Sequence, residues 1–248
     1  MTARLDLEGP THSPMLRGII FDMDGVIVDS HAAHRTAWRL FLSSIGRPHV
    51  PESELDFILD GRKRIDILQH FLGELEMREL EELGRQKDCI YRQIQLEVSP
   101  LPGVIRLVRE LHQAGILLAL ATSASRSRAQ STLAELGLLG CFKTVVTGED
   151  VSQGKPCPAI YSIARDRLKV DSTHLLGVED AVSGIRAAVG AGLACMGVAF
   201  HDAPQKLIGA GAIHVVRDFT DVTLGYLETV LCKGSVAGVK GTIGTFSS

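Results

Sequence analysis

An apolar run that ends abruptly in two acids places the strongest constraint on this sequence. Residues 16–21 are apolar apart from one arginine and one glycine, and a run this short indicates a buried strand. Asp22, Asp24 and Gly25 follow directly. Two carboxylates this close repel each other, and burying either one costs roughly several kcal/mol without a compensating cation or donor. The pattern favours a divalent-metal site in which one acid also attacks a substrate, whereas the simpler alternative is an Asp-rich turn.

Composition narrows the range of functions. The chain has 248 residues, of which 45% are hydrophobic and 22% charged, so one large domain or two unequal ones can form. A net charge of −3 without a basic stripe argues against a nucleic-acid partner, and no apolar run is long enough for a membrane partner. The five scattered cysteines form no CxxC pair, which favours reduced thiols in the cytoplasm. The first 14 residues hold no long apolar segment, so no secretory signal is expected.

Strand and helix patterns alternate in most of the chain. Each apolar strand segment from residue 116 onward is followed by an amphipathic helix, and such alternation predicts parallel βαβ units with right-handed crossovers. The predicted strands cover residues 116–121, 144–147, 175–178, 195–199 and 214–216.

Residues 30–98 differ from the rest because they contain helical periodicity and no strand pattern. We therefore predict an α/β fold, with a Rossmann-like parallel-sheet core formed by residues 15–29 and 99–232. An all-helical cap domain is inserted at residues 30–98. The segments 1–14 and 233–248, which lack periodicity, are expected to be flexible tails.

Three further strand ends carry polar groups suited to one site. Ser123 offers donors near a helix N-terminus, Lys155 supplies a positive charge, and Glu179 and Asp180 add two acids. Each also has an ordinary explanation. Ser123 could cap its helix, Lys155 could be solvated, and Asp180 could be an N-cap. Together with the acids after the first strand, they provide a cation site, anion-binding donors and a nucleophile. That combination is typical of phosphoryl transfer.

These segments resemble the four sequence motifs of the haloacid dehalogenase superfamily. The motifs are Asp22-Met23-Asp24-Gly25-Val26, Ser123, Lys155-Pro156 and Gly177-Val178-Glu179-Asp180, and they occur in the order of the family. The resemblance extends over residues 15–231. The helical insert resembles the C1-type cap of that superfamily.

The resemblance implies a covalent mechanism. Asp22 would attack phosphorus and become an aspartyl phosphate. Asp24 would protonate the leaving oxygen and later deprotonate the incoming nucleophile. Dehalogenases of the superfamily lack an Asp at the position of Asp24, so the resemblance favours a phosphatase.

The same resemblance implies a magnesium site and a phosphoryl site. Mg²⁺ would be held by Asp22, the backbone carbonyl of Asp24 and Asp180, with Glu179 beside or just behind it. The phosphoryl oxygens would be held by Ser123, the Ala124 N–H group and Lys155.

A narrower resemblance concerns the cap. The stretch His34-Arg35-Thr36-Ala37-Trp38, the pattern Gly61-x-x-Arg64-x-Asp66 and the pair Lys87 and Tyr91 are similar to the cap of β-phosphoglucomutases and related sugar phosphatases. It implies that His34 controls proton transfer and that Arg64 binds a distal phosphate. From the residues alone, a histidine at position 34 is more often structural and Trp38 more often a core residue. Lys87 more commonly reaches water, with a polar cleft as the alternative.

Residues 125–127 complete this comparison. Ser125 and Arg126 match a phosphate-binding Ser-Lys pair with arginine in place of lysine, whereas Ser127 replaces the usual asparagine of the mutases. The expected function is therefore a Mg²⁺-dependent phosphatase that hydrolyses small sugar phosphates through an aspartyl phosphate. The alternatives are a β-phosphoglucomutase and, less favoured, a non-catalytic sugar-phosphate-binding protein. We expect a cytoplasmic monomer or weak homodimer.

Overall fold

The computed structural model describes residues 16–94, 98–236 and 242–243. Strands occur at β1 (Gly18–Phe21), β2 (Val28–Asp29), β3 (Ser99–Pro100), β4 (Leu117–Thr122), β5 (Phe142–Thr147), β6 (Leu175–Glu179), β7 (Ala194–Val198), β8 (His214–Val216) and β9 (Thr242–Ile243). Helices occur at α1 (His31–Ser44), α2 (Glu52–Leu59), α3 (Arg64–Leu72), α4 (Met77–Gln93), α5 (Val104–Gln113), α6 (Arg126–Glu135), α7 (Ala159–Leu168), α8 (Val182–Gly190), α9 (Pro204–Ala210) and α10 (Leu224–Val236). Three short 3₁₀ helices lie at Leu139–Cys141, Gly148–Asp150 and Ser172–His174.

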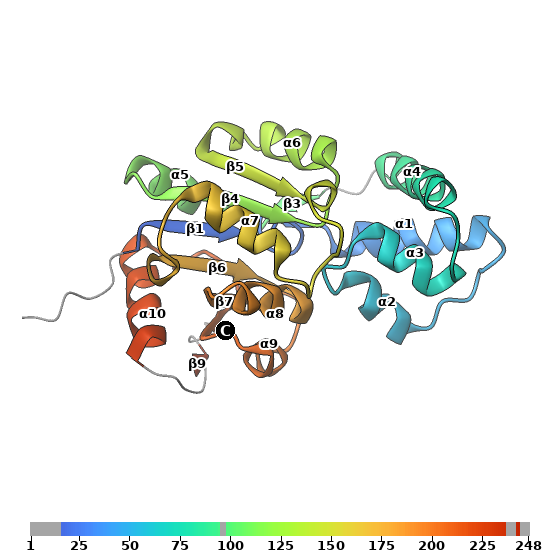
Figure 1. Cartoon of the computed structure of the whole chain (residues 1–248). Helices are drawn as coiled ribbons and strands as arrows, with labels where there is room; N and C mark the ends of the chain where they lie inside the picture. The colour runs from blue at the N-terminus through green and yellow to red at the C-terminus, as the bar shows by residue number, and fades with distance from the viewer. Residues whose placement is uncertain (1–15, 95–97, 237–241, 244–248) are drawn as a thin grey trace, which may run out of the picture.

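A seven-stranded sheet forms the centre of the molecule, in the order β5-β4-β1-β6-β7-β8-β9 (Figure 1). Every neighbouring pair of described strands in this sheet is parallel. Parallel strands present their carboxyl ends at one edge, and in Figure 1 that edge faces helices α1–α4. The α/β fold class predicted from the sequence is confirmed.

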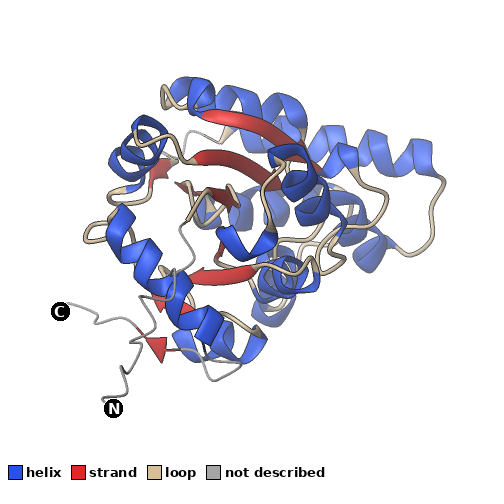
Figure 2. Ribbon diagram, turned by 60° about the vertical axis from the view of Figure 1, so that its left-hand side comes forward, coloured by secondary structure: helices blue, strands red, loops and turns tan. Residues whose placement is uncertain are grey.

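Helices cover both faces of the sheet, as Figure 2 shows. Ile19 and Phe21 point to the face packed by α5 and α10, whereas Ile20 points to the face packed by α7 and α8. Side chains alternate along a strand, so a strand buried on both faces has apolar residues at consecutive positions. This explains why polar and apolar residues do not alternate in the segment before Asp22.

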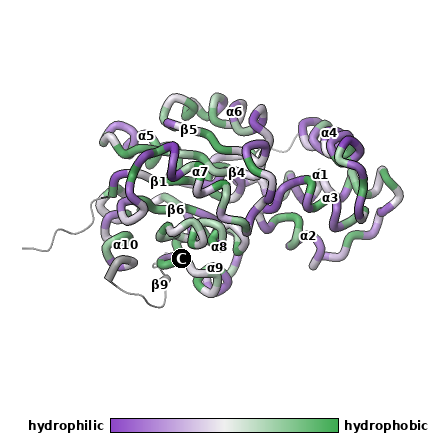
Figure 3. The backbone as a smooth tube through the Cα atoms, in the orientation of Figure 1, coloured by the Kyte–Doolittle hydropathy of each residue, from purple (hydrophilic) through white to green (hydrophobic). Residues whose placement is uncertain are grey.

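The four cap helices α1–α4 have a hydrophobic cluster of their own. Trp38, Phe41, Leu55, Leu68 and Leu80 are buried in it. Much of α4 is hydrophilic, in keeping with its exposed face (Figure 3). Strands β2 and β3 pair antiparallel, so the two connections between the cap and the core lie side by side.

Some details differ from the sequence predictions. Helix α2 lies inside the segment predicted to be all-helical, although its bounds were not predicted. The predicted tail at 233–248 is wrong for residues 233–236, which continue α10, and for Thr242–Ile243, which pairs with β8. The edge of a sheet offers free backbone groups to any nearby segment, whatever its composition. The predicted tail at 1–14 lies outside the described residues.

Membrane insertion was not expected from the sequence. Within the described part of the chain, no helix combines the length and the apolar character needed to span a bilayer.

Candidate active site

A cavity of about 500 Å³ lies between the carboxyl edge of the sheet and the cap helices. Both parts of the chain contribute to its wall, so residues far apart in the sequence meet there. The residues that the sequence singled out and that line it are Asp22, Asp24, His34, Trp38, Gly61, Arg64, Lys87, Ser123, Ala124, Ser125 and Asp180.

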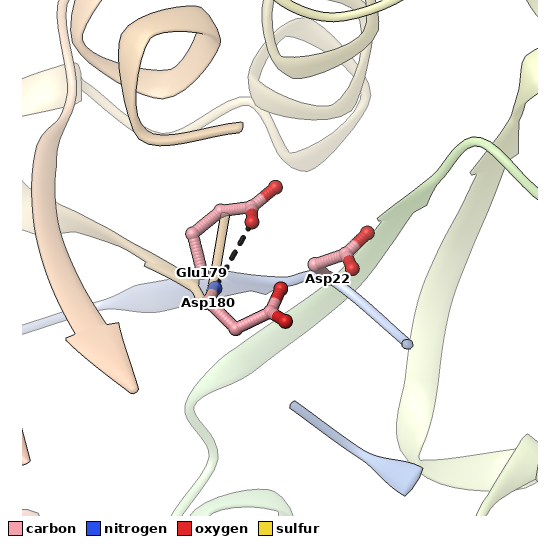
Figure 4. A group of neighbouring side chains, drawn as sticks. All are labelled: Asp22, Glu179 and Asp180. Atoms are coloured by element: carbon pink, nitrogen blue, oxygen red, sulfur yellow. Dashed lines mark hydrogen bonds between the residues drawn. The ribbon is translucent and has the colours of Figure 1, made fainter. Parts of the chain in front are cut away.

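Three buried carboxylates cluster at the ends of β1 and β6. Asp22, Glu179 and Asp180 each offer an oxygen within 4.8 Å of the others (Figure 4). Asp22 and Asp180 also line the cavity, whereas Glu179 is fully buried behind them. Burial raises the pKa of Asp22 well above its usual range against the opposing charge of Lys155, and Glu179 and Asp180 raise it further. All-oxygen ligands with excess negative charge fit a hard divalent cation.

Lys155 neutralises part of this negative charge. Its side chain is buried, and Nζ lies 2.6 Å from Asp22 Oδ1 and 2.5 Å from Glu179 Oε1. Burial would lower the pKa of Lys155, but Asp22 and Glu179 raise it above its usual range. The lysine therefore stays charged, and it contacts two of the three carboxylates, Asp22 and Glu179.

Glu179 is held mainly by the protein itself. Its Oε1 accepts a hydrogen bond from the Tyr161 hydroxyl at 2.8 Å, and its Oε2 accepts from the N–H groups of Asp180 and Ala181. A Cβ atom at Gly184 would lie 2.0 Å from Glu179 Oε1, so only glycine fits there on α8. Of the two alternatives left by the sequence, Glu179 lies behind the cavity-facing acids.

The turn after Asp24 requires glycine for two reasons. Gly25 has a φ of +76°, and a Cβ atom there would lie 1.9 Å from Asp180 Oδ2. His31 Nε2 lies 2.9 Å from the same oxygen. Burial raises the pKa of Asp180 to about 6 although His31 opposes the shift. Nothing in the sequence had marked His31, which lies at the start of a helix without a motif of its own.

Asp24 does not belong to the carboxylate cluster. Its Oδ1 accepts hydrogen bonds from Ser30 Oγ at 2.6 Å and from Arg128 Nη1 at 2.9 Å, and Arg128 Nη2 donates to Oδ2. His34 Nε2 lies 3.4 Å from Oδ1. Burial raises the pKa of Asp24, but Arg128 and His34 together hold it well below its usual range. Ser30 makes no side-chain cap to α1, and its hydroxyl donates to Asp24.

Lys87 is buried between aromatic rings of the cap. Nζ lies 3.3 Å from His34 Nδ1, 5.3 Å from the centre of the Trp38 ring and 5.0 Å from that of Tyr91. The lysine is only 4% exposed, so it faces the cavity and does not reach outward to water. Burial lowers the pKa of Lys87 to about 8 and the pKa of His34 to about 4. Trp38 is a core residue that also lines the cavity.

The lowered pKa of His34 predicts a loss of stability in acid. Its folded-state pKa of about 4 lies below the ordinary 6.5, so the unfolded chain binds more protons as the pH falls from 6.5 toward 4. At pH 5 this costs about 2 kcal/mol of unfolding free energy relative to pH 7.5. In urea unfolding, His34→Gln should remove that part of the acid sensitivity, whereas His112→Gln, at an exposed position, should leave it unchanged. Equal acid sensitivity in all three proteins would contradict the prediction.

Ser123 connects the core with the cap. Its Oγ donates a hydrogen bond to the carbonyl oxygen of Gly61 at 2.6 Å. Ser125, not Ser123, is the N-cap of α6, and it accepts from the Arg128 N–H group. The helix N-terminus therefore begins two residues later than the Ser123 pattern had suggested.

Arg126 does not take the position expected of it. It is not among the residues that line the cavity, and its Nη2 donates to Asp150 Oδ2 at 2.6 Å. Arg128, two residues further along α6, turns to the cavity instead. Matching residue types along the sequence does not show which side of a helix each residue faces. Arg64 does line the cavity and pairs with Asp88, while its buried Nε has no hydrogen-bond partner among the residues that the structure describes.

Comparison with known proteins settles the family. The sequence profile of the haloacid dehalogenase-like hydrolases matches residues 19–198, which is more than half of the chain. This chain belongs to the haloacid dehalogenase-like hydrolase family. The superfamily resemblance drawn from the four motifs is thereby confirmed.

Relatives within the haloacid dehalogenase-like hydrolases include phosphatases and mutases. Validoxylamine A 7'-phosphate phosphatase of Streptomyces hygroscopicus is 30% identical over 84% of this chain and 96% of its own. The β-phosphoglucomutase of Bacillus subtilis is 32% identical over 86% of this chain and 94% of its own. The crystal structure of CbbY from Rhodobacter sphaeroides in complex with phosphate has a TM-score of 0.73, at 26% identity over 84% of this chain and 96% of that one.

Proposed function

We propose that this protein is a Mg²⁺-dependent phosphatase that hydrolyses small sugar phosphates through an aspartyl phosphate on Asp22. The observation that carries the proposal is the position of Asp22, which lines the cavity at the end of β1 with Lys155 on Oδ1 and Asp180 nearby. A carboxylate fixed on one oxygen keeps the other for nucleophilic attack. Relatives named as phosphatases, and a similar structure in complex with phosphate, support it.

The acidic cluster fits a magnesium ion. Side-chain oxygens of Asp22 and Asp180 and the backbone carbonyl of Asp24 would hold it, with Glu179 bound to Lys155 and Tyr161 behind. When bound, the ion supplies positive charge that neutralises the phosphoryl oxygens.

Each side chain of the site then has one task. Asp22 forms a bond to phosphorus while the bond from phosphorus to the ester oxygen breaks. Asp24 gives a proton to that oxygen and takes one back from the water that hydrolyses the aspartyl phosphate. Lys155 and Ser123 hold phosphoryl oxygens, and the cap excludes bulk water from the cavity.

Binding of the ion should be visible without any substrate. A saturating concentration of MgCl₂ should raise the thermal unfolding midpoint by about 5 °C or more, because an ion that binds only the folded protein stabilises it. Asp180→Asn should remove most of this shift in differential scanning fluorimetry. Asp166→Asn, which changes an exposed carboxylate paired with Arg165, should keep it. A shift of the same size in both variants would place the ion elsewhere.

The function is tested with a panel of sugar phosphates. Purified protein with MgCl₂ should release orthophosphate from at least one of them, at a rate that falls when EDTA removes the metal. No release from any phosphate ester would overturn the hydrolase proposal.

A β-phosphoglucomutase is the second candidate. It is favoured by the mutase relative and by Arg64 and Lys87, which line the cap side of the cavity. The two candidates differ in what attacks the aspartyl phosphate, water or a sugar hydroxyl. With β-glucose 1-phosphate and a trace of the 1,6-bisphosphate, a mutase forms glucose 6-phosphate without net release of phosphate, whereas a phosphatase releases it.

A cytoplasmic location is part of the proposal. All five cysteines are free thiols, and Cys195 is buried. Such use of cysteine is typical of proteins in reducing compartments. Fractionation of cells that express the protein tests it.

A further inference from the structure

Arg128 occupies both carboxylate oxygens of Asp24. Nη1 donates to Oδ1 at 2.9 Å and Nη2 donates to Oδ2, which is the bidentate geometry of a strong charge-assisted pair. Arg128 belongs to α6 of the core and lines the cavity. The pair therefore lies at the wall of the proposed active site, and Arg128 has no role in the mechanism described so far.

The pair blocks the task proposed for Asp24. Ser30 Oγ also donates to Oδ1, so both oxygens already accept hydrogen bonds from the protein. A proton passes from Asp24 to a leaving group only through a carboxylate oxygen that faces that group, and the Arg128 guanidinium lies across both oxygens. Ser30 occupies one oxygen alone, whereas Arg128 occupies both. Arg128 is thus the donor that has to leave.

Only another anion can replace Asp24 as a partner of Arg128 without leaving a desolvated charge unpaired. The planar fork of a guanidinium fits a carboxylate and a phosphate equally well. The cap side of the cavity is rich in positive charge and attracts anions, because five cations but only two acids of the cap line it. The cations are Arg62, Lys63, Arg64, Arg85 and Lys87, and the acids are Glu81 and Asp88.

A path for the movement is also present. The Arg128 guanidinium carbon lies 5.5 Å from the centre of the Tyr91 ring on α4 of the cap. Cations remain stabilised over an aromatic face. The guanidinium can therefore turn from Asp24 toward the cap while it keeps this contact.

We propose that Arg128 is an exchangeable latch, which holds Asp24 in the ligand-free protein and pairs with an anionic group on the leaving part of the substrate when it binds. The exchange frees Asp24 for proton transfer only when a suitable substrate is present. The inference rests on the proposed phosphatase function and narrows it. The preferred substrates carry a second anionic group, a carboxylate or a phosphate, in addition to the phosphoryl group that is transferred.

Matched pairs of substrates test the latch. Glucose 6-phosphate is compared with 6-phosphogluconate, and fructose 1-phosphate with fructose 1,6-bisphosphate. For Arg128→Met, the ratio of kcat/KM for the doubly anionic over the singly anionic compound should fall by about tenfold or more, mainly through KM. The kcat for the singly anionic compound should rise, since Asp24 is no longer held. Arg128→Lys should give an intermediate ratio, because it keeps the charge but loses the fork.

A control variant accounts for the loss of one positive charge. Arg39→Met removes a half-exposed arginine that pairs with Glu52 and is not among the cavity residues, so its ratio should equal that of the wild type. An unchanged ratio in Arg128→Met, with circular dichroism showing a folded protein, would overturn the latch. The two substrate pairs show separately whether Arg128 pairs with a carboxylate or with a phosphate.

Failure of the latch and failure of the function give different results. If the wild type releases phosphate from these compounds and only the ratio is unaffected by Arg128→Met, the function stands and the latch falls. If no compound is hydrolysed, calorimetric titration of Asp22→Asn with 6-phosphogluconate and glucose 6-phosphate decides. Arg128→Met added to Asp22→Asn should lower the preference for 6-phosphogluconate about tenfold, and an unchanged preference would overturn the latch.

Discussion

Asp22→Asn should lower the hydrolysis of sugar phosphates by about 10⁴-fold or more, because an amide lacks the nucleophilic oxygen that attacks phosphorus. The substitution keeps the size of the side chain at the end of β1, where Asp22 is almost fully buried. It also removes one of three like charges from the acidic cluster, which limits any loss of stability. Orthophosphate release and circular dichroism on the same samples measure the two effects separately.

A labelling experiment sharpens this first prediction. Acid quenching of the wild type during turnover of a ³²P-labelled substrate should trap radioactivity on the protein, and Asp22→Asn should trap none. Asp166→Asn, which alters an exposed aspartate on α7, should behave like the wild type in both assays. Activity of Asp22→Asn within tenfold of the wild type would remove Asp22 from the role of nucleophile.

Lys155→Met should have the largest effect on stability. Nζ lies within 2.6 Å of Asp22 and of Glu179, and its removal leaves two carboxylates facing each other in a buried site. Breaking a buried pair by removing one partner costs about 3–5 kcal/mol, and the loss of a phosphoryl-binding cation should lower kcat by about 10²–10³-fold. Urea unfolding and phosphate release are the measurements.

The pH dependence identifies the cause of this second effect. Without Lys155, the pKa of Asp22, which burial already raises, should rise further, since its neutralising partner is gone. The folded protein then binds protons more readily than the unfolded chain, so the destabilisation should shrink as the pH falls toward 5. Lys206→Met, at an exposed pair with Asp202, should change stability by less than about 0.5 kcal/mol. A pH-independent loss in Lys155→Met would indicate a packing defect instead of unpaired charge.

The sequence predicted the α/β fold class and the core strands well, because local patterns determine them. The apolar run before Asp22 and the run before Glu179 are strands in the structure, and their acids meet at one edge, as parallel strands require. The helical periodicity between residues 30 and 98 predicted helices there, and the structure has α1–α4 in the described part of this segment. The order of the strands was not predictable, since no local pattern records which strands are neighbours.

The parts that were missed depend on helical phase and on long-range contacts. Arg126 matched a family pattern by residue type, but α6 turns it to Asp150 and turns Arg128 to Asp24. Ser30 is of a residue type that often caps helices, yet its hydroxyl donates to Asp24, six residues earlier in the chain. His31 contacts Asp180, a partner 149 residues away that no local pattern reveals.

The short antiparallel ladder of β2 and β3 has a consequence for evolution and for engineering. Val28 pairs with Pro100 and Asp29 with Ser99, so the chain leaves the core and returns to it across a single strand spacing. A turn of a few residues would bridge that gap without altering the strand order of the large sheet. Whole inserts of different size could therefore be exchanged at this junction as modules, and chimaeras that graft another enzyme's insert onto this core should express as folded proteins.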